Sequence, residues 1–229
     1  MNSNPLMMKR SLITLTNPRS PVSEAYRTLR TNLQFSGIDR QLKRLMVTST
    51  GPGEGKSTTI ANLAIVTAQT EKKTVLIDAD LRKPTVHHTF EIPNRHGLTT
   101  VITGQASAQE VVQSTTIPHL DVITAGPIPP NPAELIGSQA MTRFIEEVAT
   151  LYDQVLFDTP PVLAVTDAQI LASKLDGVIM VVNAGKTNKE MALRAKVQLE
   201  NVQANIVGVV LNNKKMQGNS GYYYYYGQN

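Results

Sequence analysis

The feature that most constrains this chain is the glycine-rich stretch STGPGEGKST at residues 49–58. It follows an apolar run at residues 44–48 and opens a helical pattern over residues 59–68. A strand, a glycine-rich turn, a Lys-Ser pair and a helix in this order are typical of a phosphate-binding loop, whose backbone N–H groups surround an anion at the positive end of the helix. Thr50 replaces the first glycine of the strict G-x-x-x-x-G-K-[ST] pattern, but further glycines keep the loop free to bend. The flanking strand and helix argue against a glycine-rich turn with a chance Lys-Ser pair.

The loop indicates a nucleotide but does not say which reaction follows. Lys56 is placed to reach the outer phosphates, and the Ser57 hydroxyl to hold Mg²⁺. Residues 213–216 read NKKM and lack the aspartate of the N-K-x-D pattern in guanine-binding domains, so ATP is favoured over GTP. Asn212 and Asn213, at the end of the last predicted strand, are candidates for contact with the base. The predicted cofactor-binding residues are Gly51, Gly53, Glu54, Gly55, Lys56, Ser57, Thr58, Asn212 and Asn213.

Strands alternate with helices along the chain. Apolar runs predict six strands, at residues 44–49, 75–77, 120–124, 155–158, 177–183 and 206–211. Helices are predicted at about residues 24–35, 59–69, 98–102, 108–114, 132–151, 167–173 and 188–202. Strands that are apolar throughout are buried on both faces, which predicts an α/β fold with a doubly wound, mostly parallel sheet of the P-loop NTPase type. The chain's 229 residues, 41% of them hydrophobic, suit one such domain.

Three aspartates fall at the carboxyl ends of these strands, where sheets of this kind bind ligands. Asp158 ends an apolar strand as a Walker-B aspartate does, and it is expected to hold Mg²⁺ together with Ser57. Asp78 and Asp80 are two residues apart, so on a continuing strand both side chains would face the nucleotide. One of these carboxylates is then spare and able to deprotonate an acceptor hydroxyl. Helix-capping or turn roles are the alternative for all three.

The composition excludes several kinds of site. No cysteine is present, so disulfides, thiolate zinc sites and iron–sulfur clusters are excluded, and the adjacent His87 and His88 are poorly placed to share a metal. No apolar run approaches the ~20 residues of a membrane span, and no signal-peptide core begins the chain, so a cytoplasmic protein is expected. Residues 1–44 carry eight basic and two acidic residues, a net +6, which leaves about −2 elsewhere. Anionic lipid, nucleic acid or an acidic partner could meet this segment, but charge alone favours a solvated helix face.

Five of the seven tyrosines form the run Tyr222–Tyr226 between two glycines. Neither strand alternation nor a helical stripe explains five identical aromatic residues, and residues 218–221 give them a flexible approach. Beside an ATP–Mg²⁺ site with a spare carboxylate, we interpret the run as a phosphate acceptor; a sticky low-complexity end is the alternative. Residues 213–222 span at most ~33 Å when extended, so length does not decide between this chain's site and a neighbour's.

These motifs together resemble the bacterial tyrosine kinases (BY-kinases), most closely the CapB-type capsule kinases of Gram-positive bacteria. The matching segments are PGEGKS at residues 52–57, VLIDADLRKP at 75–84, VLFD at 155–158 and the tyrosine cluster. Glu24, Arg27 and Arg30 also match that family's E-x-x-R-x-x-R oligomerisation motif. The resemblance covers nearly the whole chain, and the family tolerates Thr50 in its loop.

The resemblance implies ATP- and Mg²⁺-dependent autophosphorylation of Tyr222, Tyr223, Tyr224, Tyr225 and Tyr226, in trans, within a ring-shaped homo-oligomer. It implies control of capsule or exopolysaccharide synthesis, with a transmembrane polysaccharide co-polymerase that activates the kinase and recruits it to the inner face of the cell membrane. A cognate tyrosine phosphatase is an expected partner, and nucleic acid is not. The implied catalytic residues are Lys56, Asp78 and Asp80, with Asp78 as the base, and the implied Mg²⁺ ligands are Ser57, Asp80 and Asp158. The division of roles between Asp78 and Asp80 stays open.

The expected organisation is an N-terminal arm at residues 1–22, a P-loop kinase domain at 23–213 that includes an oligomerisation helix at 23–36, and a flexible tyrosine-rich tail at 214–229. Two rival functions stay open. A ParA/MinD-like ATPase switch would carry a lysine at the position of Gly51 and no tyrosine tail. A nucleotide-gated scaffold would bind ATP without producing phosphotyrosine.

Overall fold

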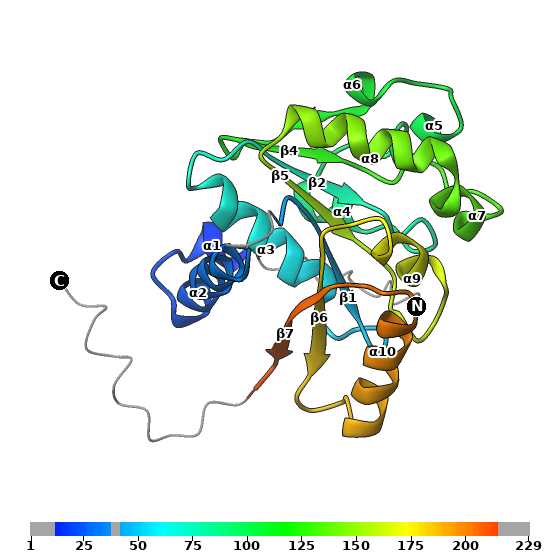
Figure 1. The fold of residues 1–229 in the computed structure, drawn as a ribbon. Helices are drawn as coiled ribbons and strands as arrows, with labels where there is room; N and C mark the ends of the chain where they lie inside the picture. The colour runs from blue at the N-terminus through cyan, green and yellow to red at the C-terminus, as the bar shows by residue number, and fades with distance from the viewer. Residues whose placement is uncertain (1–11, 38–41, 215–229) are drawn as a thin grey trace, which may run out of the picture.

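The computed structural model describes residues 12–37 and 42–214. Its centre is a seven-stranded sheet in the order β3-β4-β2-β5-β1-β6-β7 (Figure 1). Every neighbouring pair is parallel except β3 and β4, which are antiparallel at one edge. The strands are β1 (Arg44–Ser49), β2 (Thr74–Asp78), β3 (Gln113–Ser114), β4 (Leu120–Ile123), β5 (Gln154–Asp158), β6 (Gly177–Asn183) and β7 (Ile206–Asn212). The predicted α/β fold is confirmed, and β3 is the one strand among the described residues that the pattern did not predict.

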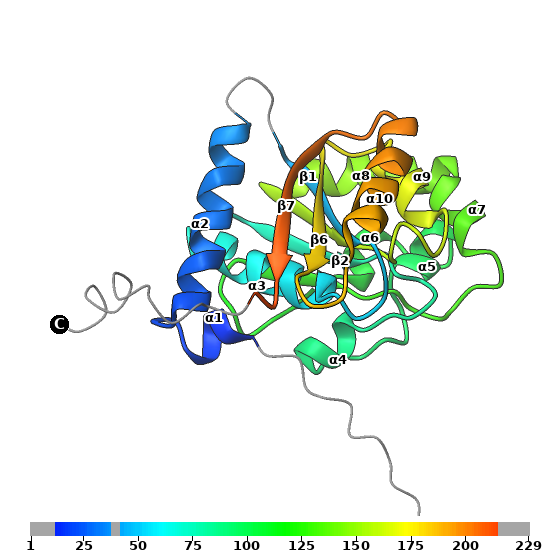
Figure 2. The ribbon, with the colours of Figure 1, turned by 90° about the horizontal axis from the view of Figure 1, so that it is seen from below.

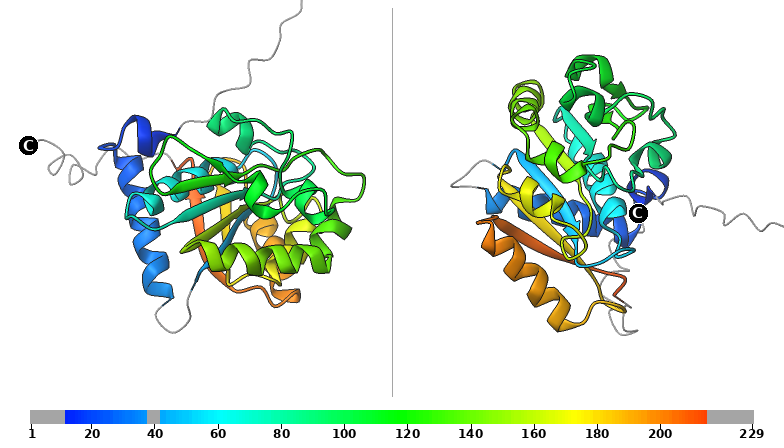
Figure 3. Two further views of the ribbon diagram at one scale, coloured as in Figure 1. Left: turned by 90° about the horizontal axis from the view of Figure 1, so that it is seen from above. Right: turned by 90° about the vertical axis from the view of Figure 1, so that its right-hand side faces the viewer.

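Helices cover both faces of the sheet (Figure 2), and Figure 3 shows the same layers from two further directions. Alternate residues of one strand enter opposite layers: Met46 packs in the layer with α8, α9 and α10, and Val47 in the layer with α2 and α3. Both faces are therefore apolar, which explains the unbroken apolar runs. The helices are α1 (Ile13–Thr16), α2 (Pro21–Ser36), α3 (Lys56–Ala68), α4 (Val86–Phe90), α5 (Leu98–Ile102), α6 (Ala108–Val111), α7 (Pro132–Gly137), α8 (Gln139–Leu151), α9 (Asp167–Ala172) and α10 (Lys189–Asn201).

Helical structure begins earlier than the sequence pattern predicted. Ser20 caps α2: its side chain accepts a hydrogen bond from the backbone N–H of Ser23, and Pro21 occupies the first turn. Ser23 is buried, and its hydroxyl donates to backbone carbonyls of the α1 segment. Residues 12–22 are thus largely helical where an irregular arm was expected, and residues 1–11 lie outside the described part of the chain.

Two further differences concern helices. The single helix predicted at residues 132–151 is divided at Ser138, whose extended backbone ends α7 and whose side chain caps α8 through the N–H of Met141. The short helix α4 was not predicted at all, although backbone N–H groups at its start donate to Asp78. Among the described residues, no helix is both long enough and apolar enough to cross a membrane.

Candidate active site

The phosphate-binding loop joins the end of β1 to the start of α3. Gly53 and Gly55 have backbone φ angles of +74° and +98°, a region that side chains rarely adopt. Gly55 also has no room for a side chain, because a Cβ there would lie 2.1 Å from Nδ2 of Asn212. These glycines turn the loop so that the first helical residue is Lys56, the residue predicted to reach the phosphates.

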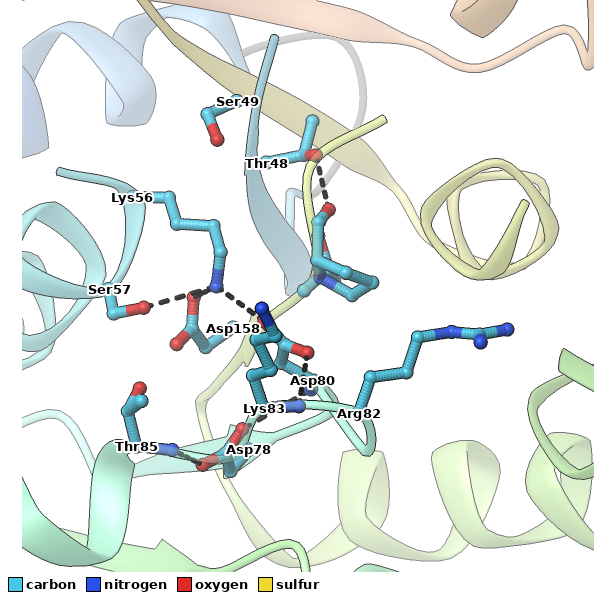
Figure 4. A network of polar contacts seen from close by, with 12 residues as sticks. Thr48, Ser49, Lys56, Ser57, Asp78, Asp80, Arg82, Lys83, Thr85 and Asp158 are labelled. Carbon is cyan, nitrogen blue, oxygen red and sulfur yellow. Dashed lines mark hydrogen bonds and ion pairs between the residues drawn. The ribbon is translucent and has the colours of Figure 1, made fainter. Parts of the chain in front are cut away.

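The Lys56 ammonium lies at the centre of the site (Figure 4). Its Nζ is 3.0 Å from Oδ2 of Asp80 and 3.3 Å from Oδ1 of Asp158, and it donates to the Ser57 hydroxyl at 3.1 Å. Burial opposes the charge of Lys56, but Asp158 and Asp80 outweigh burial and raise the pKa of the ammonium. Lys56 is therefore a fixed cation, and the structure brings together the four residues Lys56, Ser57, Asp80 and Asp158 that three separate motifs supplied.

Asp158 provides the test of whether these residues suit Mg²⁺. Its side chain is fully buried, and Oδ2 has no hydrogen-bond partner among the described residues. A buried carboxylate oxygen without a donor is costly unless a cation or water meets it. Across the described residues, no three His, Asp or Glu side chains form a metal cage. Mg²⁺ needs none, since it commonly binds through one or two carboxylates together with substrate phosphates and water. Ser57, Asp80 and Asp158 fit that pattern.

Asp78 and Asp80 do not share one orientation. The strand β2 ends at Asp78, so the alternation expected for a continuing strand does not reach Asp80. Asp80 turns to Lys56 and also accepts the N–H of Lys83 at 3.1 Å. Asp78 is buried and accepts backbone N–H groups from Asp80 and from Thr85 and Val86 at the start of α4. Burial, followed by the charge of Asp158, raises the pKa of Asp78 to about 7 against these hydrogen bonds.

The Glu54 side chain turns into the protein. Its buried carboxylate accepts hydrogen bonds from the N–H and hydroxyl of Thr50 and from the hydroxyl of Thr187. Glu54 was predicted to contact the nucleotide. Its side chain instead shapes the loop, so only its backbone N–H is left to contact a ligand. Asn212 also contacts the loop, because its Nδ2 donates a hydrogen bond to the Glu54 carbonyl at 2.9 Å. The backbone N–H of Asn213 donates to the Asn212 side chain.

Two supporting residues were missed by the sequence reasoning. Arg82 forms a two-pronged ion pair with the buried Asp167, with distances of 2.9 and 3.0 Å, which ties the loop after Asp80 to α9. Figure 4 shows Arg82 pointing away from Lys56. Thr48, on β1, donates to the carbonyl of Pro160 at 2.9 Å and braces the segment that follows Asp158. Neither contact has a sequence signal, because its partners lie 85 or more positions apart.

The residues of the predicted oligomerisation motif lie on α2. Glu24 and Arg27 form an exposed ion pair of 2.9 Å on the same helix. Arg30 turns inward and donates through Nη1 to the carbonyl of Val66 at 3.0 Å, in the last turn of α3. Arg30 Nε is buried and has no partner among the described residues. Tyr222–Tyr226 lie outside the described part of the chain.

Comparisons with known proteins show which family the chain belongs to. A family model described as an AAA domain matches residues 43–214. Tyrosine-protein kinase YwqD of Bacillus subtilis is 52% identical over 220 residues, which cover 96% of this chain and 92% of the relative. The solved structure of the chimerical protein CapA2B2 has a TM-score of 0.86 at 42% identity and covers 90% of each chain. The kinase domain of the Escherichia coli tyrosine kinase ETK has a TM-score of 0.87 at 33% identity, over 97% of this chain and 85% of that one. The predicted family is confirmed: the chain belongs to the bacterial tyrosine-protein kinases.

Proposed function

We propose that this kinase uses Mg²⁺-ATP to phosphorylate Tyr222–Tyr226 on another copy of the same chain, within a homo-oligomer. The observation that carries the proposal is the buried Lys56 ammonium between Asp80 and Asp158, beside the unpartnered Oδ2 of Asp158. Such a site has a cation for phosphate and carboxylate oxygen for a metal ion, in a loop whose backbone surrounds anions.

The residues divide the work as follows. The loop N–H groups and Lys56 bind the phosphates, while Ser57, Asp80 and Asp158 would hold Mg²⁺. An ion bound there would neutralise negative charge on the phosphates. In the transfer, a tyrosine oxygen bonds to the γ-phosphorus, the bond from that phosphorus to the β–γ bridging oxygen breaks, and ADP leaves. Asp78 is our candidate to accept the tyrosine proton, because Asp80 is already engaged by Lys56 whereas Asp78 is not.

The partners and location are proposed from the family resemblance. A transmembrane polysaccharide co-polymerase would activate the kinase and bring it to the inner face of the cell membrane, and a tyrosine phosphatase would reverse its reaction. The regulated process is capsule or exopolysaccharide synthesis. The exposed charges of α2 support assembly into an oligomer, since the surface ion pair between Glu24 and Arg27 contributes little to the stability of a single chain.

Mass spectrometry of the tail peptide tests the reaction directly. The purified chain should gain phosphate on Tyr222–Tyr226 when incubated with Mg²⁺-ATP, with or without an activator fragment, and Lys56→Met should not. Undiminished phosphotyrosine in Lys56→Met, with no other kinase present, contradicts the mechanism.

A mixing experiment tests transfer between chains. The acceptor is a full-length Lys56→Met chain, and the donor is a catalytically intact chain that lacks residues 221–229. We expect phosphotyrosine on the full-length acceptor. If the two chains assemble together but the acceptor gains no phosphotyrosine, transfer in trans is contradicted. That result would not contradict the proposed ATP site.

A further inference from the structure

The loop between β6 and α10 runs beside the phosphate-binding loop and carries an unpaired cation. Lys186 Nζ lies 3.9 Å from the point where a Cβ on Gly53 would stand, and among the described residues no other heavy atom outside Gly53 and its two neighbours lies within 4 Å of that point. Among the described residues, Lys186 forms no ion pair and its ammonium no hydrogen bond. A free ammonium thus faces the middle glycine of the loop predicted to hold phosphate.

Hydrogen bonds fix the backbone that carries Lys186. The N–H of Lys186 donates to the carbonyl of Asn183 at 3.0 Å, and the N–H of Gly185 donates to the Asn183 side chain at 2.9 Å. The Thr187 hydroxyl accepts the N–H of Asn183 at 3.0 Å and donates to the buried carboxylate of Glu54. Because Glu54 also holds Thr50, one carboxylate joins this loop to the phosphate-binding loop.

The charge balance of the site leaves a role for a second cation. Asp78, Asp80 and Asp158 are all buried near one another, and Lys56 is the one lysine in the described chain whose ammonium contacts these carboxylates. ATP would add several negative charges next to Gly53. Cations already positioned where charge accumulates stabilise it without reorganisation.

We propose that Lys186 is a further substrate-contacting residue, whose ammonium binds the outermost phosphate of ATP against Gly53. The proposal rests on the proposed ATP site. It adds a residue that belongs neither to the phosphate-binding loop nor to the segments at the ends of β2 and β5. Contact with the outermost phosphate has a specific consequence: Lys186 contributes to the affinity for ATP and much less to the affinity for ADP, which lacks that phosphate.

Nucleotide binding by the full-length chain with Mg²⁺ tests this. In Lys186→Gln we expect the Kd for ATP to rise about tenfold, because one charge-assisted hydrogen bond is lost. The Kd for ADP should change less than about twofold. Lys186→Arg should recover most of the ATP affinity. Lys189→Gln, an exposed lysine three residues further on, is the matched control and should bind both nucleotides as the parent does. Thermal melting of each variant checks that the fold is intact.

The outcomes separate this inference from the proposed function. Parent-like ATP binding by Lys186→Gln overturns the inference, as does an equal loss of ATP and ADP affinity. In either case, ATP binding that still depends on Lys56 leaves the proposed function standing. If the parent chain does not bind ATP, or if Lys56→Met gains phosphotyrosine as the parent does, the proposed function itself fails.

Discussion

The active site and the helix α2 each place three charged residues close together, but in different surroundings. In the site, the Lys56 ammonium lies buried 3.0 and 3.3 Å from two aspartates. On α2, Glu24 and Arg27 pair at the surface with 61% and 30% of their side chains exposed. In each region, one charged side chain has a buried atom with no partner in the described chain: Asp158 Oδ2 in the site and Arg30 Nε beside α2.

The two unpartnered atoms indicate opposite kinds of ligand. The unpartnered carboxylate oxygen lies beside a lysine and two more aspartates and indicates a metal cation as ligand. The unpartnered guanidinium N–H is a donor and indicates an acceptor such as a carboxylate or carbonyl. Buried charges of this kind are weak evidence for stability and stronger evidence for function. Removing charges from the site should therefore lower the rate of phosphate transfer, and removing charges from α2 should weaken contacts with other chains.

The largest effect is expected for Asp158→Asn. Phosphate transfer should fall on the order of 10²- to 10³-fold, as when one electrostatic contact to a transition state is lost. The melting temperature without nucleotide should change little, because the substitution removes both the attraction between Asp158 and Lys56 and the repulsion between Asp158 and Asp78. The rise in melting temperature with Mg²⁺-ATP should shrink, since ligand stabilisation follows affinity. A lower melting temperature without nucleotide together with full activity would assign Asp158 a structural role.

The next effect concerns the contact between the two loops. Thr187→Val leaves the N–H of Asn183 and an oxygen of Glu54 each without one partner. We expect the free energy of unfolding to fall by about 1–3 kcal/mol, measured by urea denaturation, together with weaker ATP binding. Thr150→Val removes an exposed hydroxyl bond on α8 and should change stability by less than about 0.5 kcal/mol. Equal effects of both substitutions would show that the contact between the loops carries no particular weight.

Sequence patterns predicted the parts of the site whose position follows from strand ends. The loop at residues 49–58 and Asp80 each follow an apolar strand and Asp158 ends one, and strands of a parallel sheet bring their carboxyl ends together. Their convergence on Lys56 needed no knowledge of side-chain packing. The expectation that Asp78 and Asp80 share one orientation was wrong, because side chains alternate only while a strand continues and β2 ends at Asp78.

Contacts between distant segments had no local signal. The hydroxyl of Thr187 meets Glu54 across 133 positions, and Arg30 meets the carbonyl of Val66 across 36. From the sequence alone, a threonine in a loop such as Thr187 and an arginine on a polar helix face such as Arg30 would both be expected to face solvent. Ser20 could have been found, because a serine followed directly by proline marks a helix start. The charge of α2 was identified, but its division into inward and outward residues requires the fold.

A smaller effect is expected for Arg30→Ala. The last carbonyls of a helix lack partners within it, and Arg30 serves one of them at the end of α3. Removing the side chain should lower the free energy of unfolding by about 1 kcal/mol, measured by denaturation of the dissociated chain. Asn32→Ala, which removes an exposed side chain two residues further along α2, is the control and should cost less than about 0.5 kcal/mol. A reversed order of these two losses would contradict the inward role of Arg30.

The smallest effect on the single chain is expected for the double variant Glu24→Ala with Arg27→Ala. An exposed pair contributes about 0–1 kcal/mol, so the melting curve should hardly move. If α2 contacts a neighbouring copy, the assembled mass in light scattering should nevertheless fall, and raising the salt concentration should have the same effect on the parent. Lys196→Ala with Glu200→Ala removes a comparable exposed pair from α10 and should leave the assembled mass unchanged. Equal loss of assembly in both double variants would mean that surface charge in general, rather than the motif on α2, holds the chains together.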